Sequence, residues 1–120
     1  MIFKFSIGGY NSGGFELEFK NNSLCCYQSE YPGLESLEPK YRFSVKGDGD
    51  WARLISYIHK LKWKASYWEN ACDGTQWKIK FNDRGFKFKS EGSNAYPPEF
   101  DAFMGILAKL LKKHGVPFQN

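Results

Sequence analysis

The sequence predicts an α+β domain in which an antiparallel sheet of about six strands is covered on one face by two helices. Apolar and polar residues alternate along most of the first half of the chain, which is typical of strands with one face in water. Two later segments instead carry apolar residues at helical spacing. The expected order is β-β-β-β-α-β-β-α, and these elements would form two layers.

Chain length and composition indicate one domain over residues 1–120. A chain of 120 residues and 13.9 kDa is well below the size at which domains usually divide. Aromatic residues make up 18% of it, which supplies a core and argues against disorder. No apolar run approaches the roughly 20 residues that a bilayer span needs, so no membrane partner is expected.

The first four strands are expected over residues 3–7, 15–20, 24–29 and 41–46, each with a period of two. The glycine-rich stretch 8–14 is expected to be a turn or loop. Asn21-Asn22 suits a tight turn, and the stretch with Pro32-Gly33 and Pro39 suits a longer loop.

Two helices follow from spacing and from their end signals. The first is expected from about Trp51 to about Lys64, capped by Asp48 or Asp50. The second is opened by Pro97-Pro98 and stopped by Gly115. Its apolar stripe consists of Phe100, Phe103, Leu107, Leu110 and Leu111.

A lysine-rich hairpin is predicted between the helices. Its inward residues are Trp77, Ile79, Phe81, Phe86 and Phe88, and residues 82–85 form the turn. Its outward residues are Lys78, Lys80, Lys87 and Lys89. These ammonium groups would repel one another, and a phosphate backbone or an acidic partner would relieve that repulsion. Protection of an edge strand against aggregation explains the same lysines without a ligand.

The net charge of +4 is concentrated around this hairpin. Residues 60–89 carry eight basic and three acidic side chains, whereas residues 1–59 carry six and seven. Such a patch attracts nucleic acid, an anionic surface or an acidic protein, or it simply keeps the protein soluble.

A second candidate is the aromatic pair Tyr67 and Trp68, which lies beyond the clear helix. An exposed Trp and Tyr ringed by charge have the composition of an interface hot spot. The alternative is an aromatic wedge that closes one end of the sheet. Trp63 and Trp77 are assigned to the core.

Catalytic chemistry is not expected, because the usual residue constellations are missing. His59 and His114 are the only histidines, and neither has the spacing of a metal pair or of a nucleophile's base. The carboxylate of Asp73, next to Cys72, would raise the pKa of that thiol and so work against a nucleophilic thiolate. The sequence therefore predicts no enzyme, no metal, no cofactor and no small-molecule substrate.

Base stacking on the open face of the sheet is also disfavoured. That face would show Tyr27 as its single aromatic side chain, and Glu16 and Glu18 would repel phosphate. Nucleic-acid binding would then be weak, directed at the backbone and sensitive to salt.

Three cysteines cannot all pair within one chain, and adjacent Cys25 and Cys26 would point to opposite faces of a strand. An odd count and a start that does not look like a signal peptide favour a reducing, cytoplasmic location.

Two short motifs in fixed order flank the hairpin: Asp73-Gly74-Thr75-Gln76-Trp77 before it and Gly92-Ser93-Asn94-Ala95-Tyr96-Pro97 after it. Together with the Phe-rich last helix, they resemble a family of small, uncharacterised α+β proteins from gut and related bacteria. The resemblance covers about residues 51–111 and implies the fold but no activity.

The leading functional expectation is a bacterial, non-enzymatic protein-binding module: an inhibitor, an immunity protein or an accessory factor of a mobile element. Its expected partner-binding residues are Tyr67, Trp68, Lys78, Lys80, Lys87 and Lys89. The alternative is weak binding of nucleic acid, or of a protein–RNA complex, through the lysine-rich hairpin.

Overall fold

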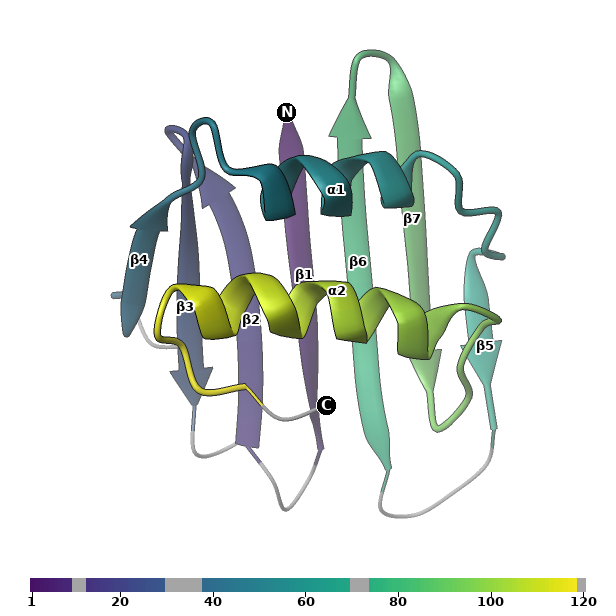
Figure 1. Ribbon diagram of the computed structural model, residues 1–120. Helices are drawn as coiled ribbons and strands as arrows, with labels where there is room; N and C mark the ends of the chain where they lie inside the picture. The colour runs from purple at the N-terminus through teal and green to yellow at the C-terminus, as the bar shows by residue number, and fades with distance from the viewer. Residues whose placement is uncertain (10–12, 30–37, 70–73, 119–120) are drawn as a thin grey trace.

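A computed structural model describes residues 1–9, 13–29, 38–69 and 74–118. These residues form a seven-stranded sheet in the order β4-β3-β2-β1-β6-β7-β5, with both helices on one face (Figure 1). The strands are β1 (Ile2–Gly9), β2 (Gly13–Lys20), β3 (Ser23–Ser29), β4 (Tyr41–Ser44), β5 (Ser66–Trp68), β6 (Thr75–Asp83) and β7 (Phe86–Ser93). The α+β class and the placement of the helices agree with the prediction.

The prediction of about six antiparallel strands was wrong in detail. β5 is an additional edge strand that pairs parallel to β7, with Tyr67 opposite Gly92 and Trp68 opposite Ser93. The other neighbouring pairs are antiparallel. β5 has only three residues, which is too short for an alternation to stand out in the sequence.

The glycine-rich loop was also placed too widely. Gly8 and Gly9 belong to β1, while Gly13 and Gly14 belong to β2 and pair with them. A Cβ atom on Gly8 would lie 2.9 Å from the Cα of Gly14, so the two backbones approach each other at this end of the hairpin. The first strands therefore run longer than their side-chain pattern shows, because glycine contributes no alternation.

The helices α1 (Gly49–Ile58) and α2 (Phe100–Lys113) lie side by side and antiparallel across the strands (Figure 1). α1 ends at Ile58 and not near Lys64 as predicted. The amides of Lys60 and Leu61 bond to carbonyls three residues back, so the chain tightens and leaves the helix. Leu61 and Trp63 then enter the core from a segment that is neither helix nor strand, and of the two only Leu61 continued the helical spacing.

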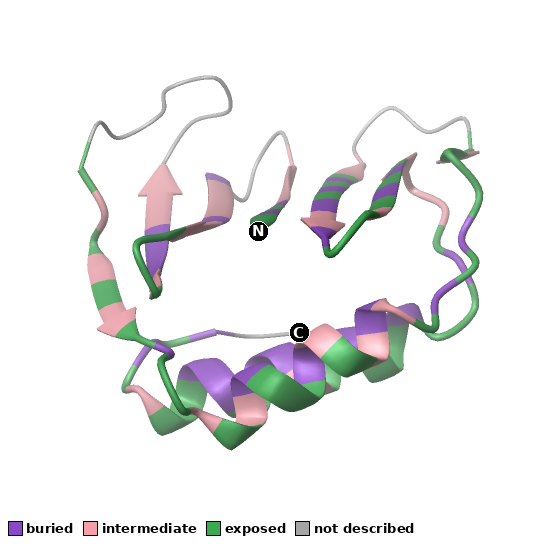
Figure 2. Cartoon of the chain, turned by 90° about the horizontal axis from the view of Figure 1, so that it is seen from above, coloured by how far each residue is buried: buried purple, intermediate pink, exposed green. Residues whose placement is uncertain are grey.

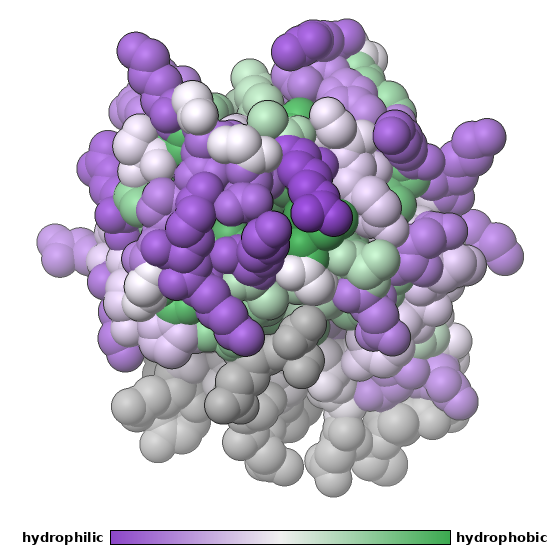
Figure 3. Space-filling model, viewed as in Figure 1, coloured by the Kyte–Doolittle hydropathy of each residue, from purple (hydrophilic) through white to green (hydrophobic). Residues whose placement is uncertain are grey.

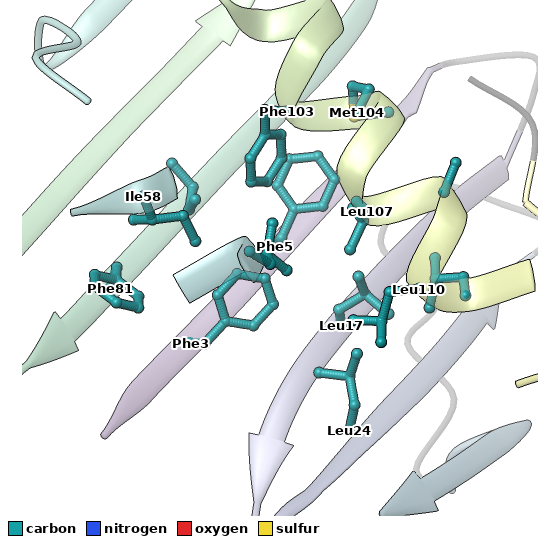
Figure 4. Close-up of a cluster of buried hydrophobic side chains, with 14 of the residues drawn as sticks. Phe3, Phe5, Leu17, Leu24, Ile58, Phe81, Phe103, Met104, Leu107 and Leu110 are labelled. Atoms are coloured by element: carbon teal, nitrogen blue, oxygen red, sulfur yellow. The ribbon is translucent and has the colours of Figure 1, made fainter. Parts of the chain in front are cut away.

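The core fills the space between the sheet and the two helices. Figure 2 shows the two layers from above, with the buried sides of the helices turned toward the strands. Phe3 and Phe5 of β1 meet Phe103 and Leu107 of α2 in its centre (Figure 4). Trp63 and Trp77 are buried as predicted.

The two motifs around the hairpin meet in one tightly packed corner. The side chain of Asn94 accepts a hydrogen bond from the amide of Thr75 at 2.9 Å, and the indole of Trp77 donates to the carbonyl of Ala95 at 2.9 Å. The indole of Trp77 lies directly against Gly92, where a larger residue would not fit. Asp73, the first residue of the motif before the hairpin, lies outside the described residues.

A charged cluster joins the start of α1 to the end of α2. Asp48 caps α1 by accepting from the amides of Asp50 and Trp51. The same carboxylate accepts from Lys113 at 2.6 Å and from His114 at 2.7 Å. Burial raises the pKa of Asp48, but these four hydrogen bonds outweigh it, so the pKa of Asp48 lies well below its ordinary value.

We expect Gly92→Ala to lower the free energy of unfolding by about 1–3 kcal/mol, because the added methyl group overlaps the Trp77 indole and the Ala95 carbonyl. Gly105→Ala is the matched control. Gly105 lies in α2, where a Cβ atom meets no neighbour, so alanine should stabilise the protein by about 1 kcal/mol. Urea unfolding measures both changes, and equal effects of the two variants would contradict the packing of this corner.

Acid should weaken the fold through Asp48. Since its pKa is lowered in the folded state, the stability that it contributes is present above its unfolded pKa, near 3.8, and is lost as the pH falls below that value. Asp48→Asn keeps a capping side chain but removes the charge, so its unfolding free energy should fall less steeply between about pH 4 and pH 2.

The variant Asp48→Ala separates the cap from the charge. It should be less stable than Asp48→Asn by about 1 kcal/mol across the pH range, because it also loses the two hydrogen bonds to the helix amides. Urea unfolding at several pH values measures both effects. An acid slope as steep in Asp48→Asn as in the wild type would contradict the assignment.

Candidate binding surface

The open face of the sheet, opposite the helices, carries the lysine-rich hairpin. β6 and β7 are joined by Arg84 and Gly85, which both have positive φ, as a two-residue hairpin turn requires. The alternation beyond the turn places Trp77, Ile79, Phe81 and Phe88 in the core. The predicted outward residues Lys78, Lys80, Lys87 and Lys89 are all exposed on the other face.

Three lysines stand in one row across the strands. Lys80 of β6 is paired with Lys4 of β1 on one side and with Lys89 of β7 on the other. Like charges at directly opposed positions are destabilising. Since the register of three strands places these groups together, the row is a property of the sheet and not of the hairpin alone.

Two glutamates moderate this charge at its edges. Glu18 lies 3.1 Å from Lys4 and 3.0 Å from Lys20, and Glu91 lies 3.8 Å from Lys78. Partial burial raises the pKa of Glu18, but its hydrogen bonds to Lys20 and Lys4 lower the pKa below its ordinary value. Among the described residues, Lys80, Lys87 and Lys89 have no acidic side chain within ion-pair distance, so they form the most accessible part of the patch.

The structure separates the two predicted aromatic residues. Tyr67 turns toward the core side, packs 6.1 Å from the ring of Trp77 and accepts a hydrogen bond from the amide of Lys64. Trp68 turns the opposite way and is 72% exposed, on the same face as the lysines. Trp68 thus belongs to the lysine surface, whereas Tyr67 supports the strand that presents it.

The expectation that Tyr27 is the single aromatic residue on the open face was therefore wrong. Tyr27 stands opposite Glu16 on that face, and Trp68 stands at its far edge, on β5. The error arose because β5 was not recognised as a strand. Glu91 was missed in the same way, since the hairpin was expected to end at Lys89 but continues to Ser93.

The other face of the molecule differs in character. Hydrophilic side chains predominate over the helices in Figure 3. None of the large hydrophobic residues of α1 or α2 is exposed as Trp68 is. We therefore regard Trp68 with Lys78, Lys80, Lys87 and Lys89 as the candidate binding surface, and refer to it as the basic face.

Both histidines end a helix, and each has a carboxylate partner that the sequence did not indicate. His59 lies 2.8 Å from Asp83, and His114 lies 2.7 Å from Asp48. The partners are 24 and 66 residues away, so no local spacing could have shown them. His59 packs between the rings of Phe81 and Phe86, and His114 stacks on Phe43.

The cysteines of β3 are both buried and free, and they point to opposite faces as expected. Burial, with a contribution from nearby Cys25, raises the pKa of Cys26 to about 12, so its thiol is protonated at neutral pH. Cys72 lies outside the described residues.

Within the described ranges, no group of three or more His, Cys, Asp or Glu side chains is placed to hold a metal ion. Among the same residues, no helix is both long and apolar enough to cross a membrane.

Comparison with known proteins adds no relative: no protein-family model, no curated protein and no solved structure matches this chain.

The lysine row makes a prediction about stability. Lys80→Glu should raise the free energy of unfolding by a few tenths of a kcal/mol, because it turns the two like-charge pairs with Lys4 and Lys89 into opposite-charge pairs. Lys46→Glu, an exposed charge change in the turn after β4, is the control and should show no such gain. Urea unfolding at low salt measures the difference, and a loss of stability in Lys80→Glu would contradict the repulsion.

Proposed function

We propose that this protein is a non-enzymatic binding module that recognises an acidic surface of another protein through its basic face. The observation that supports this proposal is the position of Trp68, which is 72% exposed on the same face as four lysines. A tryptophan left in water on a charged face is unusual in a free protein and typical of an interface anchor. An inhibitor, an immunity protein or an accessory factor of a mobile element would use such a surface.

The arrangement of charge suits a protein partner. Lys80, Lys87 and Lys89 form a compact group, while Glu91 and Glu18 stand beside it on the same face. A partner with separate acidic and basic side chains can match this mixture. A phosphate backbone, which is uniformly negative, would meet these two carboxylates unfavourably.

The row of lysines also has the character expected of a binding site. Placing Lys80 between Lys4 and Lys89 weakens the free sheet, and an acidic partner would remove that repulsion. Lys80→Glu should therefore raise the free energy of unfolding of the free protein and weaken its binding to the partner. Edge protection, the alternative explanation of the lysines, does not account for Lys80, because β6 lies between β1 and β7. It still applies to Lys87 and Lys89, since β5 pairs only with residues 91–93 of β7.

Affinity capture with tagged protein tests the proposal. After nuclease treatment, the wild type should retain one protein in near-equal amount, and Trp68→Ala should weaken its binding by about 30-fold or more. Lys80→Glu should weaken it by about tenfold, whereas Lys46→Glu, the same charge change beyond the opposite edge of the sheet, should leave it unchanged. Equal retention by wild type and Trp68→Ala would refute the basic face as the site.

Nucleic acid is the second candidate, because an exposed aromatic ring does share the face with the lysines. In that case a fluorescent single-stranded oligonucleotide would bind the wild type and lose roughly tenfold or more in affinity between 50 and 200 mM salt. Trp68→Ala would also weaken it, through loss of base stacking. Under the leading proposal no saturable binding of the oligonucleotide is expected at either salt concentration.

A further inference from the structure

A cleft of about 1220 Å³ opens at one end of the molecule, between the ends of the first strands and the beginning of α2. The strand ends that line it are at the lower side of the sheet in Figure 1. The described residues that line it come from the ends of β1, β2 and β3, from Lys40 and Thr75, from the segment before α2 and the first turns of α2, and from the residues after α2. The volume exceeds the range of about 300–1,000 Å³ that is usual for small-molecule sites, so a small organic ligand fits.

The inner wall of this cleft is apolar and aromatic. It is formed by Ile7, Phe15, Phe100, Met104 and Phe118. The rings of Phe15 and Phe118 are 5.0 Å apart, and that of Tyr96 is 4.9 Å from Phe100, so two pairs of packed rings line the cleft. Tyr96 is 47% exposed at the rim. Such a wall takes up an aromatic or alkyl body, and its ring faces attract a cation.

The polar side chains at the mouth are predominantly acidic. Glu99 and Asp101 stand at the start of α2, and Lys40 is the basic residue among the described lining residues. Lys40 donates to Gln28 at 3.1 Å and is thereby partly engaged. The negative charge of the two carboxylates is larger than the positive charge of this one ammonium group and the partial positive charge of the helix end combined. The mouth therefore favours a cation.

Glu99 is held in place in an unusual way. Its backbone is left-handed, with φ of 65°, and its side chain does not cap α2. One carboxylate oxygen instead accepts a hydrogen bond from the indole of Trp63 at 3.0 Å. Backbone strain of this kind at a non-glycine residue is common at ligand sites, where the surrounding structure maintains it. The bond to Trp63 fixes the carboxylate beside the apolar wall before any ligand arrives.

We propose that this cleft is a binding site for a small organic amine with an aromatic or alkyl body. The ammonium group would lie between Glu99 and Asp101, and the apolar body would lie on Phe100, Met104 and Phe118. The site is independent of the basic face and of its proposed partner.

The probe for this proposal is 2-phenylethylamine, compared with the neutral 2-phenylethanol and the anionic 3-phenylpropionate. Titration followed by amide NMR should show saturable shifts at Phe100 and Met104 with the amine, with a dissociation constant on the order of 1 mM or below. The alcohol should bind about tenfold more weakly and the anion more weakly still, because the three probes share the ring and differ in charge.

Variants locate the amine. Asp101→Asn and Glu99→Gln should each weaken amine binding by about fivefold without changing the binding of the alcohol, since only the charge is removed. Glu91→Gln, which neutralises a carboxylate on the open face, is the control and should have no effect. Trp68→Ala should also leave amine binding intact, so failure of the basic face and failure of this site are distinguishable.

Two results would overturn the site. One is the absence of saturable shifts at Phe100 and Met104 with amine up to about 10 mM. The other is binding of 3-phenylpropionate as tight as that of the amine, which would show that the acidic mouth does not select the ligand.

Discussion

The pairing of β1 with β6 holds the two halves of the sheet together. β1 lies between the meander of β2, β3 and β4 on one side and the hairpin of β6 and β7 on the other. Its register places Phe5 opposite Ile79 on the core face and Lys4 opposite Lys80 on the open face. Since successive side chains point to opposite faces, a slip of one residue would turn the aromatic residues outward and the lysines inward. One register therefore fixes both the core and the basic face.

The helices complete this arrangement by closing only one side of the sheet. α1 and α2 cross the joint between the two halves, and the ring of Trp51 meets that of Phe3 at 5.5 Å on β1. Asp48, with Lys113 and His114, ties the two helix ends to each other. The opposite side keeps its charged residues in water. The division of the molecule into a closed helical side and an open charged side is what leaves the open side available to the proposed partner.

Much of this organisation could be read from the sequence, and the failures have physical causes. Alternation along Phe3–Ile7 and Phe15–Phe19 identified the strands, and the lysines of the hairpin were placed on the correct face. The parallel pairing of β5 with β7 is a long-range contact of three residues, so nothing local indicated it. The exposure of Trp68 depended on that pairing. Leu61 continued the helical spacing because it is buried like the apolar residues of α1, although the chain has already left the helix after Ile58.

The candidate sites differed in how far the sequence could locate them. The basic face was visible because all four lysines lie within one hairpin. The cleft was not, since its acidic mouth and its apolar wall come from four separate parts of the chain: β1, β2, residues 96–104 and Phe118. The carboxylate partners of the histidines were hidden for the same reason, as each pair is closed only by the tertiary fold.

The central position of β1 has a consequence for how the protein is made. Phe5 and its partner Ile79 are separated by 74 residues, the difference between their positions. At about 5–20 residues per second, translation would supply the second of them about 4–15 s after the first. During this interval β1 has a partner on one side only, in β2, and its other edge is open to foreign strands. The nascent chain is therefore most exposed to aggregation before β6 is synthesised, and a ribosome-bound chaperone would have its greatest effect in that window.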